Sequence, residues 1–156
     1  MRDAGGLVAA VGDCADATPE FLREHYLYEV NMMRATFAAL QQRQPQHLGN
    51  ALIESFALHA RILMDFYLPK ARGDDAIAAH FTATGCFVGH ATAGMPPELR
   101  QKINKQITHL TYARVNASKL NQRDRLILLR LVELDHAAFT LAVSPEFMAA
   151  FASDAG

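Results

Sequence analysis

Residues 50–68 place the strongest constraint on the fold of this chain. The stretch is nineteen residues long, contains no Gly or Pro, and is mostly apolar. In a helix, most of its circumference would consist of Leu, Ile, Phe, Ala and Met. A helix that is apolar on nearly all sides packs inside a bundle. The sequence therefore predicts a helical bundle with a central helix over residues 50–68.

The three charged side chains of this stretch and Asn50 fall on one side of the predicted helix. At about 100° per residue, they lie within about 60° of one another. They are Asn50, Glu54, Arg61 and Asp65. Because a buried charge without a partner is costly, this charged stripe must meet partners or a wet cleft. Two interpretations follow: a structural ion network that joins core helices, or a polar cleft in which Arg61 or Arg114 binds a phosphate group.

The remainder of the chain predicts an all-α fold. A helix-start signal, Thr-Pro-Glu at 18–20, recurs as Ser-Pro-Glu at 144–146, and Asn121 and Asp124 have the spacing of a capping box. The expected class is an all-α bundle of four to five helices, with an additional short helix and a long loop. The expected helices cover residues 18–43, 50–68, 74–82, 96–117 and 121–143, with a terminal helix from 144 and the long loop over 83–95.

The length and composition fit one domain. We expect residues 1–17 to form a flexible tail and residues 18–156 to form a single helical-bundle domain. The two cysteines, Cys14 and Cys86, have neither metal-binding nor redox spacing, so we expect no disulfide framework and no zinc site. No apolar run approaches the roughly 18 residues that span a membrane. We therefore expect a soluble, cytoplasmic protein without a membrane partner.

Positive charge is concentrated in one segment. Residues 96–130 contain eight Lys or Arg and two acids, whereas the remainder contains seven Lys or Arg and fourteen acids. This segment is either the solvated face of two helices or a surface that binds an anion or nucleic acid. Arg114 falls on the apolar face of its predicted helix and needs an acid, for which Glu54 and Asp65 are the candidates.

His109 lies on the opposite, polar face of that helix. Its expected neighbours there are Lys102, Lys105 and Tyr112. An imidazole titrates near neutral pH, which suits a general acid or base acting on a phosphodiester. The alternative is an ordinary surface histidine.

Four other residues are candidates for polar roles. His59 points into apolar neighbours and is expected to be a hydrogen-bonded core residue. Glu29 is either a partner of Arg61 or Arg114 or an exposed acid. Di-iron bundles need two Glu-x-x-His pairs, and the chain has this spacing only at Glu133 and His136, so we expect no metal and no cofactor.

Two segments carry a family resemblance. Residues 54–66, with the letters ESFALHAR followed by Asp65 and Phe66, and residues 103–114, INKQITHLTYAR, resemble a widespread group of small bacterial helical proteins. The second segment also resembles the signature helix of HEPN domains, the higher eukaryotes and prokaryotes nucleotide-binding family. The resemblance implies a helical bundle that is commonly dimeric and, in many members, a metal-independent ribonuclease of toxin–antitoxin, CRISPR or phage-defence systems.

The motif of this family is an Arg followed, after four to six residues, by a His. His109 matches the motif His and Tyr112 loosely matches the aromatic that often follows it. The chain has no Arg in the required window: Asn104 stands at a gap of four residues, Lys105 at a gap of three and Lys102 at a gap of six. A lysine can supply charge, although it lacks the two-pronged geometry of Arg.

These observations lead to one functional hypothesis and an alternative. The hypothesis is a HEPN-like homodimer that binds RNA or nucleotides, with His109 catalytic if the protein is a ribonuclease, and with Lys102, Lys105, Arg114 and Arg61 binding phosphate. The alternative is a non-catalytic homodimeric interaction or regulatory bundle, with a partner protein and a purely structural polar network of Asn50, Glu54, Asp65 and Tyr112. A small-molecule pocket near the loop at 83–95 is a third interpretation.

Overall fold

Three long helices, α2, α3 and α6, form the centre of the protein. The computed structural model describes residues 16–107 and 120–152, and the regular structure in these two ranges is helical, which confirms the predicted all-α class. In chain order the elements are α1 (Pro19–Phe21), η1 (Leu22–Tyr26), α2 (Leu27–Ala39), α3 (Gln46–Phe66), η2 (Ala78–Phe81), α4 (His90–Ala93), α5 (Pro97–Ile107), α6 (Gln122–Ala142) and η4 (Pro145–Phe151).

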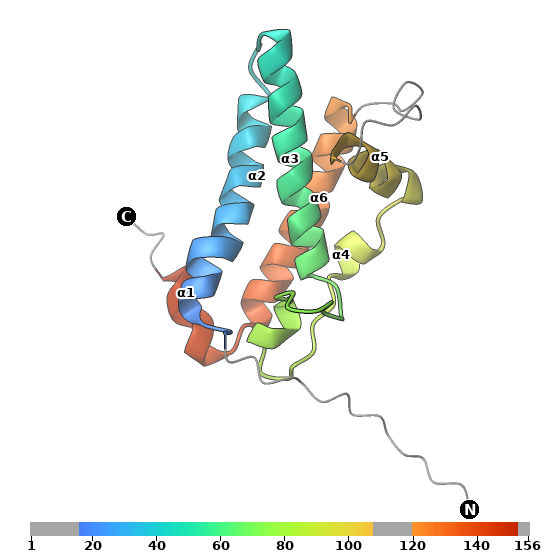
Figure 1. Ribbon diagram of the computed structural model, residues 1–156. Coiled ribbons are helices and arrows are strands. Elements are labelled where there is room, and N and C mark those ends of the chain that lie inside the picture. The colour runs from blue at the N-terminus through green and yellow to red at the C-terminus, as the bar shows by residue number, and fades with distance from the viewer. Residues whose placement is uncertain (1–15, 108–119, 153–156) are drawn as a thin grey trace, which may run out of the picture.

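The long helices stand side by side with their axes nearly aligned (Figure 1). The α2–α3 pair is an antiparallel hairpin, and α6 lies behind it and runs in the same direction as α3. On the periphery, α5 packs against α3, α4 packs against α6, and η4 packs against α1 and η1. The bundle therefore has one end closed by α1, η1, η2 and η4.

The predicted first helix is divided in the structure by a π-helical turn. Its start is confirmed, because the Phe21 backbone N–H donates to Thr18 Oγ1 at 3.1 Å. The chain then passes through the π-helical turn η1 before α2, which ends at Ala39 rather than near Arg43. The turn brings Leu22, Tyr26 and Leu27 into the core together.

The predicted central helix is longer at its start and more exposed than expected. It begins at Gln46, because Pro45 caps it and the Gly49 N–H donates to the Pro45 carbonyl at 2.9 Å. One face is buried in the bundle, whereas Leu58 and Ile62 are 43% and 42% exposed. The prediction of a helix enclosed on nearly all sides is therefore wrong: α3 has an outer surface.

The second half of the chain follows the predicted signals closely. Asn121 and Asp124 form the predicted capping box, since the Asp124 N–H donates to Asn121 Oδ1 and the Asn121 N–H donates to Asp124 Oδ2. The helix expected at 74–82 is only the short 3₁₀ turn η2, the long loop contains α4, and the terminal helix η4 is also 3₁₀. The predicted extension of α5 from 108 to 117 lies outside the described residues.

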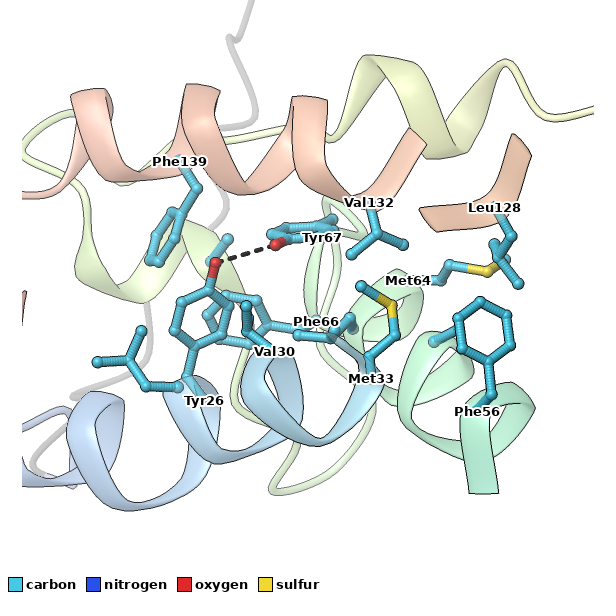
Figure 2. Packing of buried hydrophobic residues seen from close by; sticks show 14 of the residues in the cluster. Tyr26, Val30, Met33, Phe56, Met64, Phe66, Tyr67, Leu128, Val132 and Phe139 are labelled. Carbon is cyan, nitrogen blue, oxygen red and sulfur yellow. Dashed lines mark hydrogen bonds between the residues drawn. The ribbon is translucent and has the colours of Figure 1, made fainter. Parts of the chain in front are cut away.

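An aromatic and aliphatic cluster fills the space between the long helices (Figure 2). Each helix contributes side chains that are at most a few per cent exposed, and together they exclude water from the bundle. The cluster includes Tyr26, Val30, Met33, Phe56, Met64, Phe66, Tyr67, Leu128, Val132 and Phe139. Two of these, Tyr26 and Tyr67, bring hydroxyl groups into the apolar interior.

Candidate functional site

Arg61 connects the charged stripe of α3 to α5. Its Nε donates to Asp65 Oδ2 at 2.8 Å, and its Nη1 donates to Asn104 Oδ1. The side chains of Arg61 and Asp65 are 38% and 48% exposed. Glu54 is exposed and Asn50 is half-buried, so the charged stripe lies at the surface of the bundle and not in its interior.

Glu29 pairs with His59. The Glu29 Oε2 lies 2.6 Å from His59 Nδ1. His59 is 7% exposed, which agrees with the prediction of a hydrogen-bonded core histidine. The Glu29 side chain is only 18% exposed, so it is not the exposed acid of one interpretation, and its partner within the described residues is His59 and not Arg61. Arg114, the other predicted partner, lies outside the described residues.

The predicted basic face is described only in part. Lys102 Nζ lies 2.7 Å from Asp124 Oδ2, so its charge is compensated at the start of α6. Lys105 is half-buried on α5. The other three candidates of this helix, His109, Tyr112 and Arg114, lie outside the described residues.

A pocket of about 590 Å³ opens beside Arg61, and we call it the Arg61 pocket. Its apolar floor comes from α1, η1 and α3, and its polar rim comes from η1, α2, α3, the loop after α3, and α5. The floor includes Phe21, Tyr26, Leu63 and Phe66; the cations are Arg61, Lys70, Arg72 and Arg100; the acids are Glu29, Asp65 and Asp75, with His25 beside them. An apolar pocket of this size with a few polar groups is typical of small-molecule sites.

The loop after α3 brings two cations to the pocket. Pro69 cannot continue α3, and a turn follows in which the Arg72 N–H donates to Asp75 Oδ2 and the Asp75 N–H donates to the Arg72 carbonyl. Gly73 has a φ of 61° in this turn, a conformation that favours glycine. Within the described part of the chain, the Lys70 and Arg72 side chains form no ion pair.

Arg100 reaches the pocket from α5. Its Nη2 donates to the Thr92 carbonyl at 3.0 Å, which fixes the side chain without compensating its charge. Within the described residues, Arg61 is the only one of the four cations at the pocket that forms an ion pair with a carboxylate. Lys70, Arg72 and Arg100 therefore bring positive charge to the pocket that is not paired with a carboxylate of the described residues.

A chain of three polar groups lies directly under the pocket floor. The Tyr26 hydroxyl is 2.9 Å from the Tyr67 hydroxyl and 2.5 Å from His136 Nδ1. Burial raises the pKa of both tyrosines, and burial together with the charge of Arg34 lowers the pKa of His136. At neutral pH the hydroxyls are therefore protonated and the imidazole is neutral.

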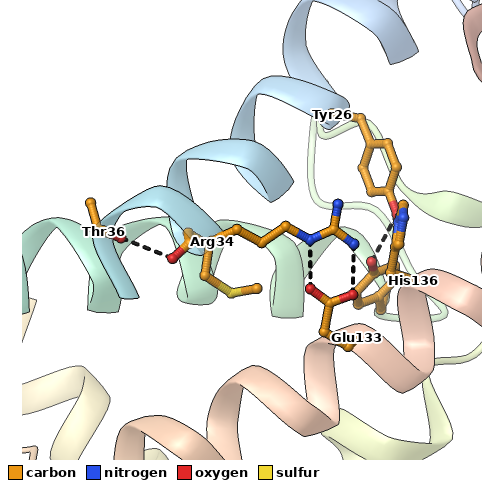
Figure 3. Close-up of polar contacts among 7 residues, drawn as sticks. Tyr26, Arg34, Thr36, Glu133 and His136 are labelled. Atoms are coloured by element: carbon orange, nitrogen blue, oxygen red, sulfur yellow. Dashed lines mark hydrogen bonds and ion pairs between the residues drawn. The ribbon is translucent and has the colours of Figure 1, made fainter. Parts of the chain in front are cut away.

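An ion pair flanks this chain on the outer side (Figure 3). Arg34 Nε and Nη2 donate to Glu133 Oε1 and Oε2 at 2.6 and 2.7 Å, a two-pronged contact between α2 and α6. The hydrogen bonds from Arg34 hold the pKa of the Glu133 carboxyl below its ordinary value. Glu133 and His136, the one Glu-x-x-His pair, thus contact Arg34 and Tyr26, and no three metal-ligating side chains gather within residues 16–107 and 120–152.

A buried carboxylate on α6 holds α4. Asp135 is 3% exposed, and its two oxygens accept hydrogen bonds from the Ala91 and Thr92 N–H groups at 3.0 and 2.7 Å. Sequence reasoning missed this residue and the tyrosine pair. The signal for Asp135 was an acid within the apolar run of α6, whereas the meeting of Tyr26 with Tyr67 and His136 has no local signal.

Comparison with protein-family models, curated proteins and solved structures found no match to this chain. Among the described residues, no helix combines the length and apolar character needed to cross a membrane. The fold and the site geometry above are therefore the grounds for a functional proposal.

Proposed function

We propose that the protein binds the phosphate groups of RNA or of a nucleotide at the Arg61 pocket. The observation that carries the proposal is the group of cations around an apolar floor, in which Lys70, Arg72 and Arg100 have no carboxylate partner among the described residues. Guanidinium and ammonium groups are the usual ligands of phosphate in proteins, and an apolar floor suits a base or sugar.

The position of Arg61 also supports the HEPN-like part of the proposal. Arg61 contacts Asn104, which occupies the gap-of-four position where the family motif has its Arg. A guanidinium from α3 therefore lies beside the place on α5 where the motif would supply one. In this proposal His109 is the acid or base of a metal-independent ribonuclease, acting in the cytoplasm in a defence or toxin–antitoxin setting.

Binding of labelled RNA and of AMP, measured by anisotropy and calorimetry at two salt concentrations, tests the proposal. We expect binding that weakens with salt, as phosphate contacts do. Arg72→Ala should weaken binding about tenfold, since a charged hydrogen bond contributes about 1.5 kcal/mol. Arg43→Ala is the matched control, because Arg43 is exposed and distant from the Arg61 pocket. Absence of binding at low salt, or equal losses in the two variants, would contradict the proposal.

Cleavage is tested separately, in EDTA. We expect His109→Ala to lose RNA cleavage while it retains RNA binding, because an acid or base acts on the reaction and contributes little to affinity. Binding by the wild type without cleavage would leave an RNA- or nucleotide-binding protein and would contradict the ribonuclease part of the proposal.

We propose, as a second candidate, that the outer face of α6 contacts a second copy of the chain. Leu134 and Leu141 lie on this face and are 62% and 90% exposed. Two copies of α6 packed antiparallel would bring Arg123, at the start of this face, towards Glu146 of the other copy, just beyond its end; both residues are exposed. Light scattering should show a dimer that Leu134→Glu converts to a folded monomer; a monomeric wild type would contradict this function.

A further inference from the structure

Glu29 is one of three acids that line the Arg61 pocket, and it differs from the other two: Asp65 pairs with Arg61 and Asp75 accepts the Arg72 backbone N–H, whereas Glu29 pairs with His59. It lines the Arg61 pocket together with Lys70, Arg72 and Arg100. A carboxylate repels a phosphate group, so a site for phosphate alone gains nothing from an acid at this position. The ligand that uses the whole pocket must carry two different groups, one for the cations and one for the carboxylate.

The structure holds the Glu29 carboxylate in place from behind. His59, nearly buried on α3, contacts Oε2 at 2.6 Å, and the Tyr28 ring packs edge-on against the His59 ring with a centroid distance of 6.0 Å. Within the described residues, Oε1 of Glu29 has no hydrogen bond of its own. One oxygen thus orients the side chain, while the other remains available to a hydrogen-bond donor in the pocket.

The size and floor of the pocket fit a ligand with an aromatic ring. The volume of about 590 Å³ lies within the range of pockets that enclose small molecules. The aromatic side chains of the lining are the half-buried Phe21 and the nearly buried Tyr26 and Phe66. Aromatic side chains stack on nucleobases, whose edges carry N–H donors that carboxylates accept.

We infer that the Arg61 pocket takes a nucleoside phosphate, with its phosphate at Lys70, Arg72 and Arg100 and an N–H group of its base donating to Glu29. This inference rests on the proposed function and adds the residue that selects the ligand. His59 is a positioning residue, since it acts through Glu29 and does not reach the pocket lining.

The test compares ligands that share a phosphate and differ in the rest of the molecule. Affinities for AMP, GMP, CMP and UMP are measured by calorimetry beside those for ribose 5-phosphate and pyrophosphate, with the wild type and Glu29→Gln. The wild type should bind at least one nucleotide about tenfold more tightly than ribose 5-phosphate, as expected for a site built around a donor group.

The Glu29→Gln variant shows whether Glu29 binds the base or only repels the phosphate, because the two roles change the affinity for the nucleotide in opposite directions. Glu29→Gln should lower the affinity for that nucleotide about tenfold, because it removes a charged hydrogen-bond acceptor. It should leave the affinity for pyrophosphate unchanged or raise it, because it removes a negative charge. If both ligands bind more tightly, Glu29 only repels phosphate and the inference is overturned. An equal loss for the nucleotide and ribose 5-phosphate would assign the donor to the sugar and would also overturn it.

Two controls keep the result interpretable. Asp65→Asn removes another acid of the pocket, the partner of Arg61, and should tighten both pyrophosphate and nucleotide binding. Thermal unfolding followed by circular dichroism shows whether Glu29→Gln is folded. His59→Gln is a second variant, which should lower the affinity for the nucleotide and leave the affinity for pyrophosphate unchanged. If no phosphate ligand binds to the wild type, the proposed function itself fails; if pyrophosphate binds as tightly as every nucleotide, only this inference fails.

Discussion

The hydroxyl of Tyr26 lies 2.5 Å from Nδ1 of His136, although 110 residues separate them in the chain. Tyr26 ends the π-helical turn η1, and His136 belongs to the middle of α6. Their contact joins the first and last long segments of the bundle through polar groups inside an apolar cluster. In such surroundings a hydrogen bond is strong and an unmade one is costly, so the contact leads to measurable predictions.

Tyr26→Phe removes a hydroxyl that contacts both Tyr67 and His136. Because Tyr26 is 3% exposed, the variant leaves the Tyr67 hydroxyl without this partner in the core, and we expect a loss of about 1–3 kcal/mol in the free energy of unfolding. Urea denaturation measures it. Tyr28→Phe is the control, since Tyr28 is 51% exposed and should change stability by less than about 0.5 kcal/mol. Equal midpoints for the two variants would contradict a stabilising role.

His136 predicts a pH dependence of stability. Its pKa in the folded protein is below the ordinary value of 6.5, so the folded state binds fewer protons than the unfolded state in this range. The contribution is therefore complete above about pH 6.5 and is lost as the pH falls through the folded-state pKa. Between about pH 7.5 and 5, the urea midpoint of the wild type should fall as the pH is lowered, and the part of this fall that comes from His136 should disappear in His136→Gln. An unchanged profile in the variant, with His47→Gln as an exposed control, would contradict the prediction.

Gly89 leaves no room for a side chain. A Cβ at this position would lie 2.6 Å from Asp135 Oδ2 and 2.6 Å from Tyr67 Cβ, and the latter belongs to the packed core. We expect Gly89→Ala to destabilise the protein by about 1–3 kcal/mol. Gly49→Ala is the matched control, since its Cβ would meet only Gln44 Cβ at 3.8 Å and it lies within α3, where Ala should stabilise by about 0.5–1 kcal/mol. Thermal unfolding measures both effects. A Gly89→Ala variant that unfolds at the temperature of the wild type would contradict the packing around Gly89.

Asp135 predicts a local effect on α4. Asp135→Ala removes the carboxylate and leaves the Ala91 and Thr92 N–H groups without their acceptor. We expect the free energy of unfolding to fall by about 2–3 kcal/mol. Hydrogen exchange of these two amides should accelerate more than exchange in α2. Asp74→Ala, at an exposed position, should leave both rates unchanged. Uniform acceleration across the protein would show a general loss of stability and not the release of α4.

Local signals in the sequence predicted the helices well and the site poorly. The cap at Thr18 and the capping box of Asn121 and Asp124 are present, because a cap depends only on residues within one turn. The start of α3 was predicted four residues late, since Gly49 was interpreted as part of a break and is instead a helical residue. The sequence identified Arg61 as a candidate, but its neighbours in the pocket come also from α1, η1, α2, the loop after α3, and α5.

The remaining features depend on contacts that no sequence pattern specifies. The pair of Glu29 with His59 requires the register between α2 and α3, and the pair of Arg34 with Glu133 requires that between α2 and α6. A small-molecule pocket near the loop at 83–95 was the third interpretation of the sequence, whereas the lining of the Arg61 pocket includes the loop that follows α3 and no residue of 83–95. Which polar side chains meet is decided by the packing of the apolar ones.

The π-helical turn η1 carries one residue more than regular α-helical spacing would place there. The residues before it are thereby rotated relative to α2, so that Phe21 can stack on Phe81 with a ring distance of 5.7 Å while Tyr26 packs against Phe139. Phe21, directly before the turn, and His25 and Tyr26, within it, all line the Arg61 pocket. The length of the chain here, counted in single residues, therefore constrains the hydrophobic core and the binding pocket together: an insertion or deletion cannot alter one and preserve the other.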